Sequence, residues 1–118
     1  MENLPLYLYH ATPKRKLGRI KKQGLIPGKK KNWSDSSSNK IYLATDPDIA
    51  YDFVINSDID LDEEEKIAII EINTLNLDKD LFDIDQNIQF YDDEPIYSYE
   101  YEGIIPPDSF SNITFEEI

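Results

Sequence analysis

The chain has 118 residues and a net charge of −12, with 40% hydrophobic and 31% charged residues. This length and balance predict one globular domain over residues 1–118 and exclude an intrinsically disordered chain. Cysteine is absent, which excludes disulfides, a thiolate nucleophile and a cysteine zinc site, and fits a reducing cytoplasm. No apolar run approaches the roughly 20 residues of a membrane span, so we expect a cytoplasmic protein without a membrane partner.

The charge is unevenly distributed along the chain. Residues 1–40 carry a net +8, and residues 41–118 carry a net −20. One interpretation is a basic patch that meets an anionic ligand on an otherwise acidic body. The alternative is that the two blocks attract each other and only keep the domain in solution. Both interpretations stay open at this point.

The N-terminal third predicts a strand followed by a basic helix. Residues 6–10 are apolar and aromatic, which favours a strand. Thr12 suits an N-cap, Pro13 the first helical position, and Gly24 the C-cap. The lysines between them form the exposed side of the helix. Its apolar stripe consists of Leu17, Ile20 and Leu25.

A second strand and a second short helix follow. Residues 40–44 predict the strand. The helix begins at Pro47, with Thr45 or Asp46 as its cap. The side chains that we expect to face the core from this helix are Ile49, Ala50 and Phe53.

The C-terminal half predicts strands. Residues 66–73 (KIAIIEIN) are nearly continuous in apolar residues, which indicates a central strand. Residues 96–102 alternate strictly, so tyrosines 97, 99 and 101 share one packing face and Ser98, Glu100 and Glu102 the other. Residues 113–118 predict a last strand. Together the elements predict an α+β fold, with a mostly antiparallel sheet and two short N-terminal helices.

A site that cleaves NAD needs few groups, and the chain offers a candidate for each. A histidine can grip the adenosine ribose, and His10 is the only histidine. An aromatic plane must hold the nicotinamide ring, for which Tyr42 and Tyr51 are candidates. A carboxylate must stabilise the cationic transition state as the glycosidic bond opens. The candidates for that carboxylate are Glu94, Glu100 and Glu102.

Two segments resemble the first half of the ADP-ribosyltransferase fold, in the His-Tyr-Glu branch that includes the poly-ADP-ribose polymerases. They are residues 8–12 (LYHAT) and residues 41–44 (IYLA). The resemblance implies a small split antiparallel sheet that binds NAD as substrate in the cleft between its halves, without a metal. It implies that His10 contacts the adenosine ribose and that Ala11, through its backbone, holds the nicotinamide amide. Tyr42 and Tyr51 would frame the nicotinamide ring.

The chain departs from the family at Ala11, and the resemblance is looser in the third motif, which carries the catalytic Glu. Ala11 replaces the glycine of the family, and Thr12 stands at its Ser/Thr position. The family places its catalytic Glu at the start of a late strand. We rank Glu100 first, since it shares a face of the late strand with Ser98 and Glu102. Glu102 is second, and Glu94, just before the strand, is third.

Residues 103–110 (GIIPPDSF), with the same first half, also resemble the C-terminal half of RNA 2′-phosphotransferases. Those enzymes share the fold and end in a similar Pro-Pro run. They also need an N-terminal lobe and several arginines, whereas Arg15 and Arg19 are the only arginines here. The phosphotransferase interpretation is therefore the weaker one.

Each candidate also has a simpler explanation. His10 can be a strand-end histidine bonded to backbone, the tyrosines can be core or rim aromatics, and glutamates on a strand are often solvated. The acidic run at residues 58–65 has aspartates at calcium-loop spacing, but it lacks the glycine and the terminal glutamate of such a loop. We predict no metal site.

The leading hypothesis is a small ADP-ribosyltransferase-like enzyme that transfers ADP-ribose from NAD to a protein or nucleic acid. The alternative is an inactive acidic binding module of the same fold, for example an anti-defence inhibitor. A composition rich in Lys, Asn, Ile, Asp and Tyr hints at an AT-rich genome, such as that of a bacteriophage. An RNA 2′-phosphotransferase-like enzyme is the third hypothesis. The sequence predicts no oligomeric state.

Overall fold

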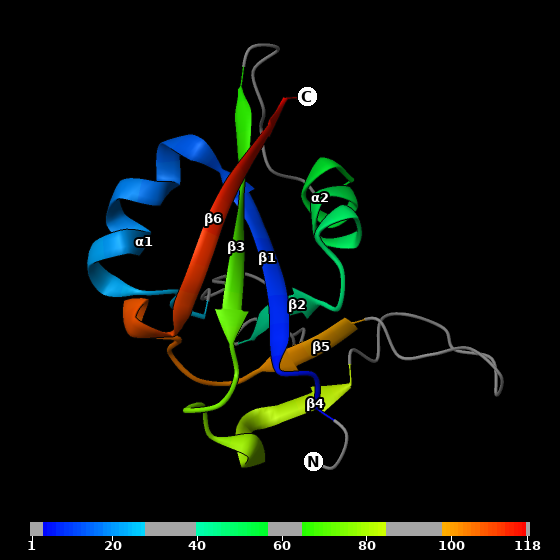
Figure 1. The fold of residues 1–118 in the computed structure, drawn as a ribbon, viewed down its shortest axis with the longest axis vertical. Coiled ribbons are helices and arrows are strands. Elements are labelled where there is room, and N and C mark those ends of the chain that lie inside the picture. Colours follow the sequence, from blue (N-terminus) through cyan, green and yellow to red (C-terminus); the bar gives the residue numbers. More distant parts are fainter. Residues whose placement is uncertain (1–3, 28–39, 57–64, 85–97, 118) are drawn as a thin grey trace, which may run out of the picture.

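The computed structural model describes residues 4–27, 40–56, 65–84 and 98–117, and these residues form two α-helices and a six-stranded antiparallel sheet (Figure 1). The sheet order is β4-β5-β2-β1-β3-β6. The strands are β1 (Tyr7–Pro13), β2 (Ile41–Ala44), β3 (Lys66–Asn73), β4 (Phe82–Ile84), β5 (Ser98–Tyr101) and β6 (Phe110–Glu117). The helices are α1 (Leu17–Gln23) and α2 (Pro47–Ile55), with short 3-10 turns η1 (Lys14–Lys16), η3 (Lys79–Leu81) and η4 (Pro107–Ser109).

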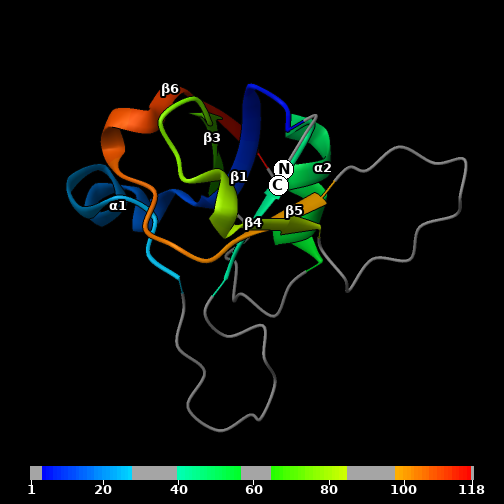
Figure 2. The ribbon, with the colours of Figure 1, turned by 90° about the horizontal axis from the view of Figure 1, so that it is seen from below.

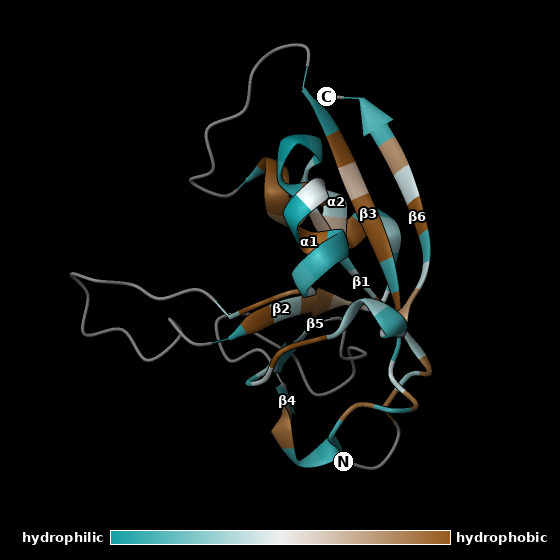
Figure 3. Ribbon diagram, turned by 90° about the vertical axis from the view of Figure 1, so that its left-hand side faces the viewer, coloured by the Kyte–Doolittle hydropathy of each residue, from teal (hydrophilic) through white to brown (hydrophobic). Residues whose placement is uncertain are grey.

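The sheet divides into two halves between β1 and β2. All seven residues of β1 pair with β3, but β1 and β2 pair only at Tyr9 and Ala44. Figures 1 and 3 show β1, β3 and β6 running across the direction of β2, β5 and β4. We call β1, β3 and β6 the long half, and β4, β5 and β2 the short half. Strands β1 and β2 diverge beyond the pair of Tyr9 with Ala44, so the rest of this edge of β1 is not paired with β2.

The two helices cover opposite faces of the long half, as Figure 2 shows most directly. On the α1 side, one buried cluster joins the two halves and includes Leu8, Leu43 and Ile70. On the α2 side, a smaller cluster consists of Val54, Ile67 and Ile69. A fully buried aliphatic side chain contributes about 1.5–3 kcal/mol to folding, so both clusters hold the helices in place.

The start of α2 and the end of α1 lie where the sequence predicts them. Asp46 caps α2 by accepting a hydrogen bond from the backbone N–H of Asp48 at 2.8 Å, and Pro47 is the first helical residue, as predicted. Gly24 closes α1 at φ +84°, and its N–H donates to Ile20 at 2.8 Å. A Cβ at Gly24 would collide with the carbonyl of Ile105. Glycine is therefore required where α1 turns back to the sheet.

The predicted start of the first helix is wrong. Thr12 and Pro13 belong to β1, where they pair with Ala68 and Ile67 of β3, and Thr12 makes no cap. The turn η1 intervenes before α1 begins at Leu17. The local capping signal loses to a strand pairing that extends along the whole of β1.

The later strands agree more closely with the predictions. β3 covers residues 66–73, as predicted, and lies inside the sheet between β1 and β6 (Figure 3). Tyr99 and Tyr101 are buried in the α1-side cluster, which confirms the packing face. β6 begins three residues earlier than predicted. The acidic segment 57–64, Glu94 and Tyr97 lie outside the described residues. Within the described ranges, none of the helices has the length and apolarity to cross a bilayer.

Candidate active site at the split of the sheet

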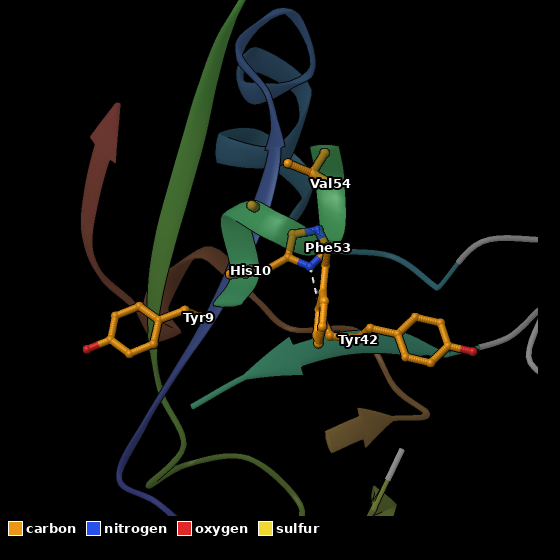
Figure 4. Close-up of a pocket in the computed structure, with 7 residues that line it drawn as sticks. Tyr9, His10, Tyr42, Phe53 and Val54 are labelled. Carbon is orange, nitrogen blue, oxygen red and sulfur yellow. Dashed lines mark hydrogen bonds between the residues drawn. The ribbon is translucent and has the colours of Figure 1, made fainter. Parts of the chain in front are cut away.

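His10 lies where the two halves of the sheet separate. The imidazole Nδ1 and the backbone oxygen of Tyr42 are 3.0 Å apart (Figure 4). Continued pairing beyond Tyr9 and Ala44 would set Ala11 opposite Tyr42. The imidazole of His10 instead makes a hydrogen bond with the backbone of β2 at this position. The side chain of His10 therefore links the two halves where the strand pairing ends.

This hydrogen bond fixes the tautomer of His10. A carbonyl oxygen can only accept, so Nδ1 carries the hydrogen and donates it to Tyr42. Burial lowers the pKa of His10 below its ordinary value, against an opposing effect of the Tyr42 bond. The ring is therefore neutral at pH 7, and Nε2 is a hydrogen-bond acceptor.

A first hollow lies between His10 and α2, and we call it the α2 hollow. Its volume is about 170 Å³, which is smaller than the roughly 300 Å³ at which ligand-sized pockets begin. Phe53 lines the hollow with His10 and Tyr42, and Figure 4 shows the phenol of Tyr42 extending away from the imidazole of His10. The hollow suits one ring and not a whole dinucleotide. Its lining is Tyr9, His10, Ala11, Tyr42, Ala50, Phe53 and Val54.

Phe53, and not Tyr51, lines the α2 hollow together with Tyr42. The helix presents Ala50, Phe53 and Val54 to the hollow, which is the spacing of one helix face. Tyr51 points elsewhere, because its hydroxyl donates to the carbonyl of Glu117 at 2.9 Å and its ring packs on the α2-side cluster. The predicted pairing of Tyr42 with Tyr51 around one ligand ring is therefore not what the structure brings together.

A second hollow lies between His10 and α1, and we call it the α1 hollow. Its volume is about 470 Å³. Lys16 and Arg19 give it positive charge, and the buried Thr12 lies in its wall. His10 and Ala11 line both hollows, so this segment of β1 separates them. The full lining adds Ile20, Gln23, Gly24, Leu25, Ile26 and Pro27.

The top-ranked carboxylate lies on the strand next to Tyr42. Tyr42 and Glu100 are directly paired residues of β2 and β5, so their side chains share one face of the sheet. Glu100 is only 3% exposed, and its Oε2 lies 2.8 Å from Nζ of Lys40. Glu102 is 55% exposed and lies 3.8 Å from the same Nζ. Glu100 does not line either hollow beside His10.

The arrangement is suited to holding a ligand with one flat ring and an anionic part. The α2 hollow offers aromatic and aliphatic walls, the α1 hollow offers two cations, and His10 offers a neutral acceptor between them. The described residues contain no group of three or more side chains able to hold a metal ion.

Two residues of this region were missed or misplaced by sequence reasoning. Phe53 was assigned to the core, although its spacing from Ala50 already placed the two on one helix face. Lys40 was read only as the start of a strand, because its partnership with Glu100 depends on the register of β2 against β5. By contrast, a basic patch that meets an anionic ligand was one of the two interpretations of the basic block, and Lys16 and Arg19 line the α1 hollow.

The chain was compared with known proteins. No protein-family profile matches it, and no curated protein matches it significantly. The geometry of the site is therefore the basis for any functional assignment.

Proposed function

We propose that the protein binds NAD and transfers ADP-ribose to a protein or nucleic acid, on a split sheet of the ADP-ribosyltransferase type. One observation carries the proposal: the strands bearing His10, Tyr42 and Glu100 are consecutive neighbours, in the order β1-β2-β5. These residues are 32 and 58 positions apart along the chain. A His-Tyr-Glu set identified only from its order in the sequence is thus supported by adjacency in space.

The nicotinamide ring occupies the α2 hollow in this proposal. The hollow has the size for one ring and walls made by Tyr42, Phe53 and Ala50. Aromatic walls favour a flat ring through stacked or tilted contacts. Ala11 is at the edge of β1 beside the hollow, where its backbone can meet the carboxamide, as the family resemblance implies.

The ADP part of NAD follows the edge of β1 into the α1 hollow. Lys16 and Arg19 attract its pyrophosphate, and Arg19 can hold a phosphate with two hydrogen bonds. His10 accepts a hydrogen bond from a ribose hydroxyl through Nε2 while Nδ1 stays bound to Tyr42. One imidazole then anchors the ligand and the junction of the two halves.

The chemical step breaks the bond between ribose C1′ and the nicotinamide nitrogen. The bonding electrons go to the ring, which leaves as neutral nicotinamide, and an acceptor oxygen or nitrogen bonds to C1′ and loses its proton. Positive charge develops on the ribose in the transition state, and a carboxylate on β5 stabilises it. Glu100 is the choice by register, because it pairs directly with Tyr42.

Incubation with NAD labelled in the nicotinamide and in the adenine tests the proposal. The purified protein is assayed alone and with cell lysate, and free nicotinamide and labelled macromolecules are measured. We expect nicotinamide release with the wild type and a loss of about 100-fold in rate for Glu100→Gln. Wild-type protein that releases no nicotinamide, alone or with lysate, would overturn the proposal.

The burial of Glu100 favours one alternative, an inactive binding module of the same fold. This carboxylate is paired with Lys40 and does not line the hollows beside His10. In that case NAD is bound and not cleaved, and the acidic surface binds a basic protein. Salt-sensitive binding to a basic partner together with intact NAD after long incubation would support the alternative.

A further inference from the structure

One face of the β2–β5 pair gathers four polar side chains. Tyr42 opposes Glu100 in the register of the two strands. The same register, continued by two residues, sets Lys40 opposite Glu102. All four side chains therefore project on one side of this pair of strands, which is the side opposite the packed Tyr99 and Tyr101.

Lys40 forms its shorter ion pair with Glu100, and not with the residue that the register predicts opposite it. Its Nζ lies 2.8 Å from Oε2 of Glu100 and 3.8 Å from Oε1 of Glu102, the residue that the continued register would set opposite Lys40. Glu100 is 3% exposed and Glu102 is 55% exposed. Glu102 is exposed to solvent, whereas a buried carboxylate needs a charged or hydrogen-bonding partner. The burial of Glu100 thus explains the choice.

The charge state of Lys40 agrees with this geometry. Donating a hydrogen bond to Glu100 is the largest cause that raises the pKa of Lys40 above its ordinary value, against an opposing effect of burial. Lys40 therefore stays protonated throughout the neutral range.

We propose that Lys40 is the positioning residue for Glu100: it holds the ionised carboxylate beside Tyr42 and makes Glu100, not Glu102, the functional acid. This inference rests on the proposed cleavage of NAD. The hydrogen bond occupies Oε2 and so fixes the carboxylate, which has three rotatable side-chain bonds. Glu102 offsets part of the charge of Lys40, so that Glu100 keeps more of its negative potential for the developing cation.

The pairing is tested without NAD by titrating the Lys40 side chain by NMR in three proteins. They are the wild type, Glu100→Gln and Glu102→Gln, each checked for an intact fold by its amide spectrum. We expect the Lys40 pKa to fall toward its ordinary value in Glu100→Gln and to change much less in Glu102→Gln. A larger fall of the Lys40 pKa in Glu102→Gln would show that Lys40 pairs mainly with the exposed Glu102 and would overturn the inference.

The positioning role is tested by kinetics of nicotinamide release. Lys40→Met is expected to leave the Kd for NAD unchanged and to lower kcat by about 100-fold, as misplacement of a reacting group does. Lys40→Arg restores most of kcat. The double variant Lys40→Met/Glu100→Gln is no slower than Glu100→Gln alone, because Lys40 acts only through Glu100. The matched control is Lys66→Met, which removes an exposed strand lysine.

The outcomes separate this inference from the proposed function. A wild-type protein that releases no nicotinamide contradicts the proposed function, whatever the NMR titration shows. An active wild type with full kcat in Lys40→Met contradicts the positioning role alone. A Lys40→Met variant whose main defect is a raised Kd assigns Lys40 to ligand binding instead, and also contradicts it.

Discussion

The two halves of the sheet differ in how firmly their strands are joined. In the long half, β1 pairs with β3 along seven residues, and both helices pack on its faces. In the short half, the strands have three or four residues. Among the described residues, the contacts that join the halves include the Tyr9–Ala44 pair, the imidazole hydrogen bond and the shared α1-side cluster. The long half is the more extensively paired part, and the candidate site lies where the short half departs from it.

The largest expected effect comes from the core cluster that joins the halves. Ile70 in β3 and Leu43 in β2 are both fully buried members of it. Ile70→Ala and Leu43→Ala should each lower the free energy of unfolding by about 2–5 kcal/mol. Chemical denaturation, followed by circular dichroism and fluorescence, should show one transition in both variants. Two separate transitions in Leu43→Ala would mean that the short half folds on its own.

The next effect concerns the ion pair in the short half. Lys40→Met leaves the buried carboxylate of Glu100 without its cation and should lower the free energy of unfolding by about 1–3 kcal/mol. Arg15→Met breaks the exposed pair of Arg15 with Glu65 and should cost less than about 1 kcal/mol. Thermal unfolding of the two variants measures the difference. Equal losses would show that the pair of Lys40 with Glu100 is as solvent-screened as the surface pair.

A smaller effect isolates the imidazole that joins the halves. His10→Ala removes the hydrogen bond to Tyr42 and should lower the free energy of unfolding by about 1 kcal/mol. His10→Asn places an amide N–H near the position of Nδ1, so it should recover most of this loss. Denaturation of both variants gives the comparison. The prediction fails if Asn is no better than Ala.

The smallest effect is a dependence on pH. The pKa of His10 is lowered in the folded state, so the unfolded chain binds a proton first as the pH falls below the ordinary value of 6.5. The contribution of His10 to stability is therefore complete above pH 6.5 and declines below it. The stability difference between wild type and His10→Asn, measured from pH 8 to pH 5.5, should shrink. A constant difference contradicts a lowered pKa of His10 in the folded state.

The long half was largely predictable from the sequence, because its signals are local. The run of apolar residues gave β3 its bounds, and Asp46 with Pro47 gave the start of α2. The exception is the end of β1, where pairing with β3 overrode the cap at Thr12. A cap competes for one or two hydrogen bonds, while the pairing engages the whole strand.

The sequence predicted only the strand residues of the candidate site. The candidates His10, Tyr42 and Glu100 come from motif and alternation, and the sheet order sets their strands side by side, although Glu100 does not line the hollows beside His10. The residue that α2 contributes was not predictable, because a step of one residue along the helix rotates the direction of the side chain by about 100°. That rotation exchanges Tyr51 for Phe53, and docking against β1 decides it. Predicting the ion pair of Lys40 with Glu100 requires the register between β2 and β5, because the two residues are 60 positions apart in the sequence.

The most direct test of the account is calorimetric titration of NAD into the wild type and into His10→Asn. The variant keeps a donor for Tyr42 but lacks the acceptor nitrogen, so it separates the ligand role of His10 from its structural role. Tyr7→Ala is the matched control, because Tyr7 is 40% exposed on the same strand and does not line the hollows beside His10. We predict saturable NAD binding in the wild type and in Tyr7→Ala, and at least a tenfold loss, about 1.4 kcal/mol, in His10→Asn. Equal affinity in all three proteins, or none in the wild type, contradicts an NAD site at the split of the sheet.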